Sequence, residues 1–365
     1  MSKIRITYAC FLNASGYSFS AQHYLSALEK TGMFDIKIRI FGSSPSRPSI
    51  GDDQYRHYKE MVNKPDDPDR ILIYHCIPTI QKRIKGYNKT IGFATFETVE
   101  PPENWVQILN KNDGIIVPSE FNNKIFSHTQ IQKPIYTIPH CLDFEQYNNE
   151  VLYMYEHEPF TFIFMGIFRE RKGYKQLIEA FFTEFSDTDN VQLIIKTDKT
   201  EKARAYIEKV KKQMGINKGF APIILENKVF EARELPSYLK SMDCLVSPTM
   251  GEGFGLPAMQ CMALGVPVIV TNYSGCQEYA NDKTATLLEP NGFVFRSNMD
   301  NIPQFNSKKW AFLEVSKIRE AMRYACNNPA NIHRKANWAY SYVRNKFNYK
   351  IVGNLFVNMI REIYG

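Results

Sequence analysis

The chain has 365 residues, of which 44% are hydrophobic, and this length exceeds one typical domain and suffices for two hydrophobic cores. Its 45 basic and 38 acidic residues give a formal net charge of +7, which excludes a dedicated nucleic-acid-binding protein but fits an anionic partner such as a nucleotide. No apolar run approaches the roughly 20 residues that span a bilayer, and the N-terminus lacks the apolar core and cleavage site of a secretory signal.

Strand-like and helix-like segments alternate along the first part of the chain, which predicts a parallel α/β domain. Apolar and alternating runs predict strands over residues 3–10, 34–41, 70–77, 89–97, 114–119 and 134–140. Helical spacing predicts helices over residues 18–32, 101–112 and 120–129, the first of them stopped by Gly32. A loop is predicted over residues 43–54, and the acidic groups at 51–54 and 65–69 are expected to lie in solvated loops.

A polar and aromatic stretch, residues 141–159, predicts the passage to a second domain. The alternation then restarts, with strands predicted over residues 160–168, 190–197, 222–227 and 243–249, and a further strand that ends at Thr271. Helices are predicted over residues 174–185, 200–215 and 234–242. Two successive series of similar size indicate two Rossmann-like domains with a cleft between them.

The stretch from Gly251 to Thr271, GEGFGLPAMQCMALGVPVIVT, has the composition of a ligand-binding turn. Pro257 suits the first turn of a helix and Gly265 the position just past its end, so residues 257–264 are predicted to form a short helix. The loop at its N-terminus, residues 250–255, then offers backbone N–H groups and the positive end of the helix dipole to an anion or to sugar hydroxyls.

Four residues of this stretch are candidate ligand contacts. Gly253 and Gly255 allow a ligand to approach the backbone closely. The carboxylate of Glu252 can accept hydrogen bonds from hydroxyls, and Gln260 lies one turn into the helix, directed toward the same ligand. The alternative is a tight strand-to-helix turn in which the glycines serve packing alone.

The seven cysteines are scattered along the chain and form no C-x-x-C pair. We therefore expect buried free thiols in a reducing cytoplasm, with no metal or redox role.

Residues 248–279 resemble the signature of family 4 retaining glycosyltransferases of the GT-B fold, the glycosyl transferases group 1, whose pattern is roughly E-G-F-G-L-P-x-x-E-A-M-A-x-G-x-P-V-I. The resemblance implies that Glu252 contacts the hydroxyls of the donor sugar. It also implies that backbone amides between the two acidic positions serve the sugar and phosphates, at Gly253, Phe254, Gly255 and Leu256. The second glutamate of the pattern, which binds the ribose, is Gln260 here, and an uncharged amide makes a weaker or differently oriented ribose contact.

Residues 164–181 resemble the first strand and loop of the family's donor domain, in which Lys172 would grip the diphosphate. The family's arginine after the strand glycine is absent, because Ile167 stands there. Arg169 or Arg171 would replace it, and Arg169 is favoured; the alternative for this basic loop is a solvated charged segment. Of two adjacent glycines near the donor phosphates in the first domain, only Gly16 remains.

Three further residues each have a functional and a structural interpretation, and a fourth, His140, has a structural one. His75 ends a predicted strand and would lie near the donor sugar, or it is a core histidine. Glu97 would orient an acceptor hydroxyl or pair with a cation. Glu278 would contact the donor or make structural hydrogen bonds, and His140 is expected to organise the passage between domains.

The resemblance covers nearly the whole chain and implies a GT-B architecture, an α/β fold of two Rossmann-like domains that face each other across a cleft. Residues 1–145 would form the acceptor-side domain and residues 146–345 the domain that binds the nucleotide sugar. The C-terminal helix, residues 346–365, would cross back to the first domain, and the sequence NKFNYK at 345–350 predicts a break at the crossing.

The expected function is retaining transfer of a sugar from a nucleotide diphosphate donor to an acceptor hydroxyl, with no metal and no further cofactor. A glycan or lipid-linked acceptor is favoured. Two alternatives stay open: transfer to a modified base in DNA, and a non-catalytic protein that binds a sugar nucleotide. Lys82, Arg83, Lys85 and Lys89 would contact an anionic lipid surface or a nucleic-acid backbone, or form a solvated helix. The expected location is cytoplasmic, with peripheral contact to a membrane.

Overall fold

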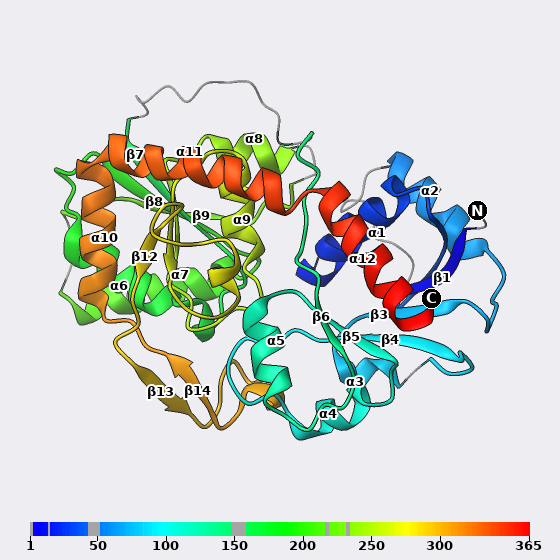
Figure 1. The fold of residues 1–365 in the computed structure, drawn as a ribbon. Coiled ribbons are helices and arrows are strands. Elements are labelled where there is room, and N and C mark those ends of the chain that lie inside the picture. The colour runs from blue at the N-terminus through cyan, green and yellow to red at the C-terminus, as the bar shows by residue number, and fades with distance from the viewer. Residues whose placement is uncertain are drawn as a thin grey trace. The chain divides into compact units, whose positions relative to one another are not determined.

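The computed structural model describes residues 3–13, 15–42, 52–82, 84–145, 147, 158–215, 219–230 and 234–365 (Figure 1). The chain divides into two compact units. Unit 1 comprises Met1–Phe144, Phe230–Ala232 and Asn345–Gly365, and unit 2 comprises Glu145–Val229 and Arg233–Arg344. The acceptor and donor roles expected for the two halves of the chain stay predictions.

Unit 1 is built on a parallel six-stranded sheet with strand order β2-β1-β3-β4-β5-β6. Its strands are β1 (Ile4–Cys10), β2 (Phe34–Ile40), β3 (Ile71–His75), β4 (Lys89–Phe93), β5 (Gly114–Val117) and β6 (Ile135–Thr137). Every residue of β3 and β5 is buried, as is usual where helices cover both faces of a parallel sheet. All six strands coincide with predicted ones, although β4 ends well before Glu97.

The helices of unit 1 are α1 (Gly16–Lys30), α2 (Asp52–Asn63), α3 (Pro78–Gln81), α4 (Glu103–Leu109), α5 (Glu120–Ser127) and α12 (Tyr349–Tyr364). The predicted stop of α1 is confirmed, because Gly32 has a φ of +68° and donates its N–H to the Glu29 carbonyl at 2.9 Å. Helix α2 was not predicted, and the expectation of a loop through residue 54 is wrong from Asp52 onward; residues 43–51 lie outside the described residues. Its apolar stripe, chiefly the buried Tyr58 and Met61, is narrow and surrounded by charged residues.

The C-terminal helix α12 belongs to unit 1, where Figure 1 shows it beside α1. The helices approach closely because Gly353 has no side chain, and a Cβ there would lie 2.7 Å from the Ala27 carbonyl oxygen. The predicted break before this helix is confirmed, since α11 (Pro329–Lys346) ends before it and the Asn348 side chain caps α12 by accepting from the Ile351 N–H at 2.9 Å.

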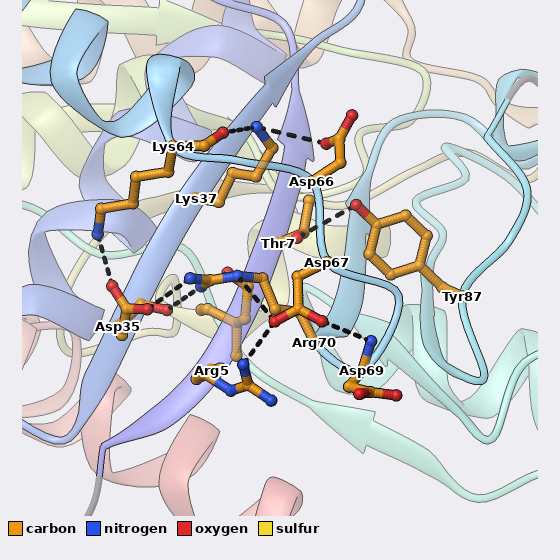
Figure 2. Close-up of polar contacts among 11 residues, drawn as sticks. Arg5, Thr7, Asp35, Lys37, Lys64, Asp66, Asp67, Asp69, Arg70 and Tyr87 are labelled. Carbon is orange, nitrogen blue, oxygen red and sulfur yellow. Dashed lines mark hydrogen bonds and ion pairs between the residues drawn. The ribbon is translucent and has the colours of Figure 1, made fainter.

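A network of charged side chains joins the start of β2 to the segment before β3 (Figure 2). Asp35 accepts from Lys64 Nζ at 2.5 Å and from Arg70 Nη2 at 2.6 Å, and the hydrogen bond from Lys64 is the main cause of the lowered pKa of Asp35. Asp67 accepts from Arg5 at 2.5 Å and from the Asp69 N–H at 3.0 Å. The expectation that the acidic residues at 65–69 are simply solvated is therefore wrong for Asp67. Its carboxylate connects the loop before β3 to Arg5 of β1.

Unit 2 is built on a second parallel six-stranded sheet, with strand order β12-β11-β10-β7-β8-β9. Its strands are β7 (Phe160–Met165), β8 (Val191–Lys196), β9 (Ile223–Glu226), β10 (Cys244–Ser247), β11 (Val268–Thr271) and β12 (Thr286–Leu288). Its helices are α6 (Tyr174–Glu184), α7 (Thr200–Gln213), α8 (Glu234–Lys240), α9 (Leu256–Ala263), α10 (Val315–Asn327) and α11, with short 3₁₀ helices η2 (Glu170–Lys172), η3 (Ser274–Glu278) and η4 (Pro303–Phe305).

An antiparallel hairpin of β13 (Phe293–Arg296) and β14 (Lys308–Ala311) adds to unit 2 (Figure 1). The sequence predicted no element over residues 280–334, where β12, this hairpin and α10 lie. For β13 the reason is that Phe293 and Phe295 are 53% and 60% exposed, so that its apolar residues do not mark a core face. Over the described ranges, no helix combines the length and the apolarity needed to cross a membrane.

The core of unit 1 contains three buried histidines, His23, His75 and His140. His75 Nδ1 lies 2.6 Å from the Tyr8 hydroxyl and Nε2 lies 3.0 Å from the Ser20 hydroxyl. Ser20 donates to the Tyr17 carbonyl, so it accepts from Nε2, and Nδ1 accepts from Tyr8. Both ring nitrogens of a neutral imidazole are thereby hydrogen-bonded.

Burial lowers the pKa of all three histidines. It lowers the pKa of His23 and of His140 to about 3, and the pKa of His75 falls well below its usual value through burial and then through the nearby His140. Because these rings stay neutral in the folded protein while the unfolded chain binds protons near pH 6.5, the unfolded state gains protons first as the pH falls.

We therefore predict that the free energy of unfolding of the intact chain falls between pH 7 and pH 5. Each such histidine contributes a slope of up to about 1.4 kcal/mol per pH unit below its unfolded pKa. Chemical denaturation at several pH values measures the slope. His23→Gln should make it shallower by about one histidine's share, whatever the variant's absolute stability; an identical slope in both proteins contradicts the prediction.

Candidate functional site

The predicted helix after the glycine loop is present as α9, which begins one residue earlier than expected. Gly255 precedes it with a φ of +93°, a conformation that L side chains rarely adopt. A Cβ at Gly255 would also lie 2.4 Å from the hydroxyl of Tyr279, and that hydroxyl donates to the Gly255 carbonyl at 2.7 Å. Glycine is therefore needed here for both conformation and space.

The loop that carries Glu252 is held by the start of η3. The Glu252 N–H donates to the Ser274 hydroxyl at 2.8 Å, and the Gly275 N–H donates to the Glu252 carbonyl at 2.9 Å. Gly275 packs so closely that a Cβ on it would lie 2.2 Å from the Gly253 carbonyl oxygen. These contacts fix the backbone of Glu252. Its N–H and carbonyl groups are hydrogen-bonded within the protein and are therefore not free to bind a ligand.

The Glu252 carboxylate lies between two cations. Lys172 Nζ donates to Oε1 of Glu252, and Arg171 Nη1 lies 3.7 Å from Oε2. The three side chains are only 10–14% exposed. Arg171 Nε also lies 3.5 Å from the buried Asp300 carboxylate, whose pKa is raised because burial outweighs the attraction of Arg171. The Glu252 cluster, which we define as Glu252, Lys172, Arg171 and Asp300, therefore pairs two cations with two acids.

The two cations are placed by the short helix η2, which follows β7. The Met250 N–H donates to the Arg171 carbonyl at 2.7 Å, so the loop before Glu252 is hydrogen-bonded to η2. Gly173 ends η2 with a φ of +75° and lies against Pro248. Backbone contacts on both sides of the Glu252 cluster thus hold the cations against the carboxylate.

Arg169, which the sequence favoured over Arg171 as the second donor cation, is not in the Glu252 cluster. Its side chain lines a separate cavity together with Ile167, and Ile167 is 44% exposed. Arg171 is instead the arginine that contacts Glu252.

Gln260 is buried, at 4% exposure, and its Nε2 donates to the hydroxyl of Tyr147 at 3.2 Å. The Tyr147 carbonyl in turn accepts from Arg344 at 2.8 Å. The Gln260 side chain is therefore directed toward a residue of the stretch that was predicted to join the domains.

The other candidate residues lie outside the Glu252 cluster. Gly16 is the first residue of α1, and His75 ends β3 with both ring nitrogens hydrogen-bonded, as its core interpretation expects. Glu97 was expected to end a strand, and this is wrong because β4 ends at Phe93; Glu97 is half-buried in the segment that follows.

Three further residues have the following places. His140 Nδ1 lies 3.1 Å from the Tyr24 hydroxyl in the core of unit 1. Glu278 is half-buried in η3. Lys82, Lys85 and Lys89 are exposed around α3 and β4, and Arg83 lies outside the described residues.

The seven cysteines are free thiols, and six of them are buried, which confirms the prediction of buried free thiols for those six. Within the described part of the chain, no group of three or more histidine, cysteine or carboxylate side chains has an arrangement that could hold a metal ion.

Sequence reasoning missed Asp300, Ser274 and Tyr147. Ser274 lies in a turn whose serine is unremarkable in sequence, but its φ of +63° marks a constrained position. Asp300 and Tyr147 are distant in sequence from the residues that they contact, and no sequence motif predicts these contacts.

The region that contains the Glu252 cluster resembles a known protein family. Residues 159–300 match the family described as glycosyl transferases group 1. A 41.2 kDa protein of the cps region of Klebsiella pneumoniae is 27% identical over 193 residues, which is 52% of this chain and 46% of that protein. An uncharacterized glycosyltransferase of Methanocaldococcus jannaschii is 27% identical over 178 residues, 48% of this chain and 41% of that protein. The chain thus spans less than half the length of these relatives.

Solved structures match over the whole chain at low sequence identity. Sucrose-phosphate synthase from Thermosynechococcus elongatus has a TM-score of 0.69 at 14% identity, and the match covers 99% of each chain. The Anabaena protein HepE in complex with UDP-glucose has a TM-score of 0.66 at 11% identity and covers 98% of this chain and 99% of that one. These matches confirm the expected GT-B fold, and the family match confirms the resemblance for residues 159–300.

Gly173 offers a direct test of how the Glu252 cluster is supported. A Cβ at Gly173 would lie 1.9 Å from the Pro248 carbonyl oxygen, whereas a Cβ at Gly215, which has a similar φ of +67°, would meet nothing within 4 Å. We predict that Gly215→Ala lowers the free energy of unfolding by about 1 kcal/mol, the strain of the left-handed conformation. Gly173→Ala should lower it by about 3 kcal/mol or more, because a backbone clash is added. Chemical denaturation measures both, and equal losses contradict the packing described here.

Proposed function

We propose that this chain, whose residues 159–300 carry the match to glycosyl transferases group 1, moves a sugar from a nucleotide diphosphate donor to an acceptor hydroxyl with retention of configuration. The observation that carries the proposal is the pairing of Glu252 with Lys172 and Arg171 in a site that is nearly closed to solvent. A carboxylate that accepts from hydroxyls and cations that bind phosphate are the two kinds of group that such a donor requires.

In the proposed site, the donor takes over the partners that the side chains now give each other. Lys172 would donate to a phosphate oxygen in place of Glu252, and Glu252 would accept from hydroxyls of the sugar. Each group exchanges one charged or polar partner for another, so neither is left buried without a partner. Arg171 lies near enough to Glu252 to supply the second cation, and we propose it for this role in place of Arg169, which the sequence analysis favoured.

The proposed reaction breaks the bond between the sugar's anomeric carbon and the phosphate oxygen while the acceptor oxygen bonds to the same face. The departing phosphate oxygen takes the acceptor's proton. Negative charge grows on the diphosphate as the bond breaks, and Lys172 and Arg171, fixed in a site of low exposure, would stabilise that charge. Side-chain cations thus stand where other enzymes use a metal ion, and the proposal includes neither metal nor cofactor.

A glycan or lipid-linked sugar is the acceptor class that we propose, with a modified base in DNA as its alternative. The exposed Lys82, Lys85 and Lys89 would favour an acceptor that is anionic or held at an anionic surface. One observation favours a different function, a protein that binds sugar nucleotides without transfer: Gln260, which replaces the family's ribose-binding glutamate, is engaged by Tyr147.

Glu252→Gln and Lys172→Ala should each lower the rate of sugar release from the preferred donor by about 100-fold, the usual effect of removing one transition-state contact. The measurement is nucleotide release from a panel of nucleotide diphosphate sugars, chosen beforehand by thermal shift of the intact protein. Lys175→Ala is the matched control, because Lys175 pairs with Glu170 at 2.7 Å outside the Glu252 cluster.

If Glu252→Gln or Lys172→Ala released nucleotide at the wild-type rate, the donor would not bind at the Glu252 cluster. Donor binding by thermal shift without any turnover, in the presence or absence of divalent metal, would favour the non-catalytic alternative. Loss of all activity in excess chelator, restored by a divalent metal, would refute the metal-independent reaction.

Gln260→Glu tests whether this position contacts the ribose. A carboxylate makes stronger hydrogen bonds to two hydroxyls than an amide does, so we predict a lower donor KM with kcat changed less, because the ribose does not change charge during transfer. Tyr147→Phe is the companion variant, since it removes the hydroxyl that Gln260 now contacts. If neither substitution alters donor KM, Gln260 serves only to hold Tyr147.

A further inference from the structure

Unit 2 contains a cavity that the donor proposal does not use. It is a cavity of about 910 Å³ between η2, the exposed face of α7 and the loop at residues 298–301. None of Glu252, Lys172 and Gln260 lines it. Its volume is in the range of ligand-binding clefts.

The cavity has positive charge that its own acids do not neutralise. Arg169, Lys202 and Lys209 line it, and over the described residues none of the three forms an ion pair. Three acids also line the cavity, and each is paired with another cation. Glu170 pairs with Lys175 at 2.7 Å and with Arg296 at 3.4 Å, Asp198 pairs with Lys199 at 3.4 Å, and Asp300 pairs with Arg171 at 3.5 Å.

One wall of the cavity is aromatic. Lys202, Tyr206 and Lys209 follow each other at helical spacing along α7, which brings a ring between the two ammonium groups. Tyr206 meets Tyr174 edge-on with ring centroids 5.2 Å apart, and Tyr174 stacks on Phe168 at 3.6 Å, so that three contacting rings line the cavity. Burial raises the pKa of Tyr174 to about 12, so this phenol stays protonated and can donate.

Two asparagine residues also line the cavity. Asn298 Nδ2 donates to Asn301 Oδ1 at 2.8 Å, and both residues line the cavity. Asp300 and Asn301 have φ values of +58° and +56°, an uncommon conformation that places consecutive polar residues at one turn. Asn side chains offer both donors and acceptors to hydroxyl groups.

We propose that this cavity binds an acidic saccharide, a sugar that carries a phosphate or a carboxylate. The unpaired cations would bind the acidic group, the aromatic wall would pack against the ring, and the asparagines would take the hydroxyls. A free inorganic anion would use only the first of these three features, and a neutral sugar would leave the cations unused. The inference does not depend on the transfer reaction, because the cations, rings and asparagines that it uses lie outside the Glu252 cluster, which shares only Asp300 with the lining of the cavity.

The test is a calorimetric titration of the intact protein with glucose 6-phosphate, glucuronic acid, glucose and inorganic phosphate. At least one of the two acidic sugars should bind at least 10-fold more tightly than glucose and inorganic phosphate. The double variant Lys202→Ala/Lys209→Ala should weaken that binding at least 10-fold. The double variant Lys211→Ala/Lys212→Ala is the matched control, because it removes the same charge from the same helix without touching the lining, and it should change binding less than 2-fold.

Several results would overturn the proposal. They are no binding of either acidic sugar, equal binding of inorganic phosphate, and equal losses in the two double variants, which would indicate unspecific attraction to a basic helix. Lys172→Ala should leave the binding unchanged, and its loss in that variant would assign the acidic sugar to the Glu252 cluster instead of this cavity.

Discussion

The buried carboxylate of Glu252 sets the arrangement of the site in unit 2. A charge at this depth is tolerated only beside opposite charge, and Lys172 and Arg171 provide it. Both cations come from one short helix, η2, so a single backbone contact, from the Met250 N–H to the Arg171 carbonyl, keeps the two loops in register. Glycines at 173, 255 and 275 make this possible, because each lies where a Cβ would strike backbone or a buried hydroxyl.

Asp300 connects this cluster to the neighbouring cavity. Its carboxylate lies 3.5 Å from Arg171 Nε, and the same residue lines the cavity beside Arg169. The basic loop at 169–172 is thereby divided between two tasks: Arg171 and Lys172 are directed toward Glu252, and Arg169 toward the cavity. An acidic ligand in the cavity would bind Arg169 and leave Arg171 and Lys172 paired with Glu252.

Much of the fold could be predicted from the sequence. Parallel sheets that are buried on both faces have apolar strands, which differ clearly in composition from the polar loops. All strands of unit 1 and five of the six in the sheet of unit 2 coincide with predicted segments. The short helix after the glycine loop was predictable from Pro257 and Gly265 alone, since local backbone preferences act at both ends. Helix α2 and the β13–β14 hairpin were missed because their apolar residues are sparse or exposed.

The sequence by itself determined the fold class, the position of the glycine loop and the choice of Glu252 and Lys172 as candidate site residues, because these depend on local spacing and residue type. Only the tertiary structure decided which arginine meets Glu252, that Asp300 and Ser274 support it, and that Gln260 contacts Tyr147. It also showed His75 as a neutral core residue with both nitrogens engaged. The physical reason is that the direction of a side chain and the partner of a buried polar group are set by segments far apart in sequence, which no local pattern records.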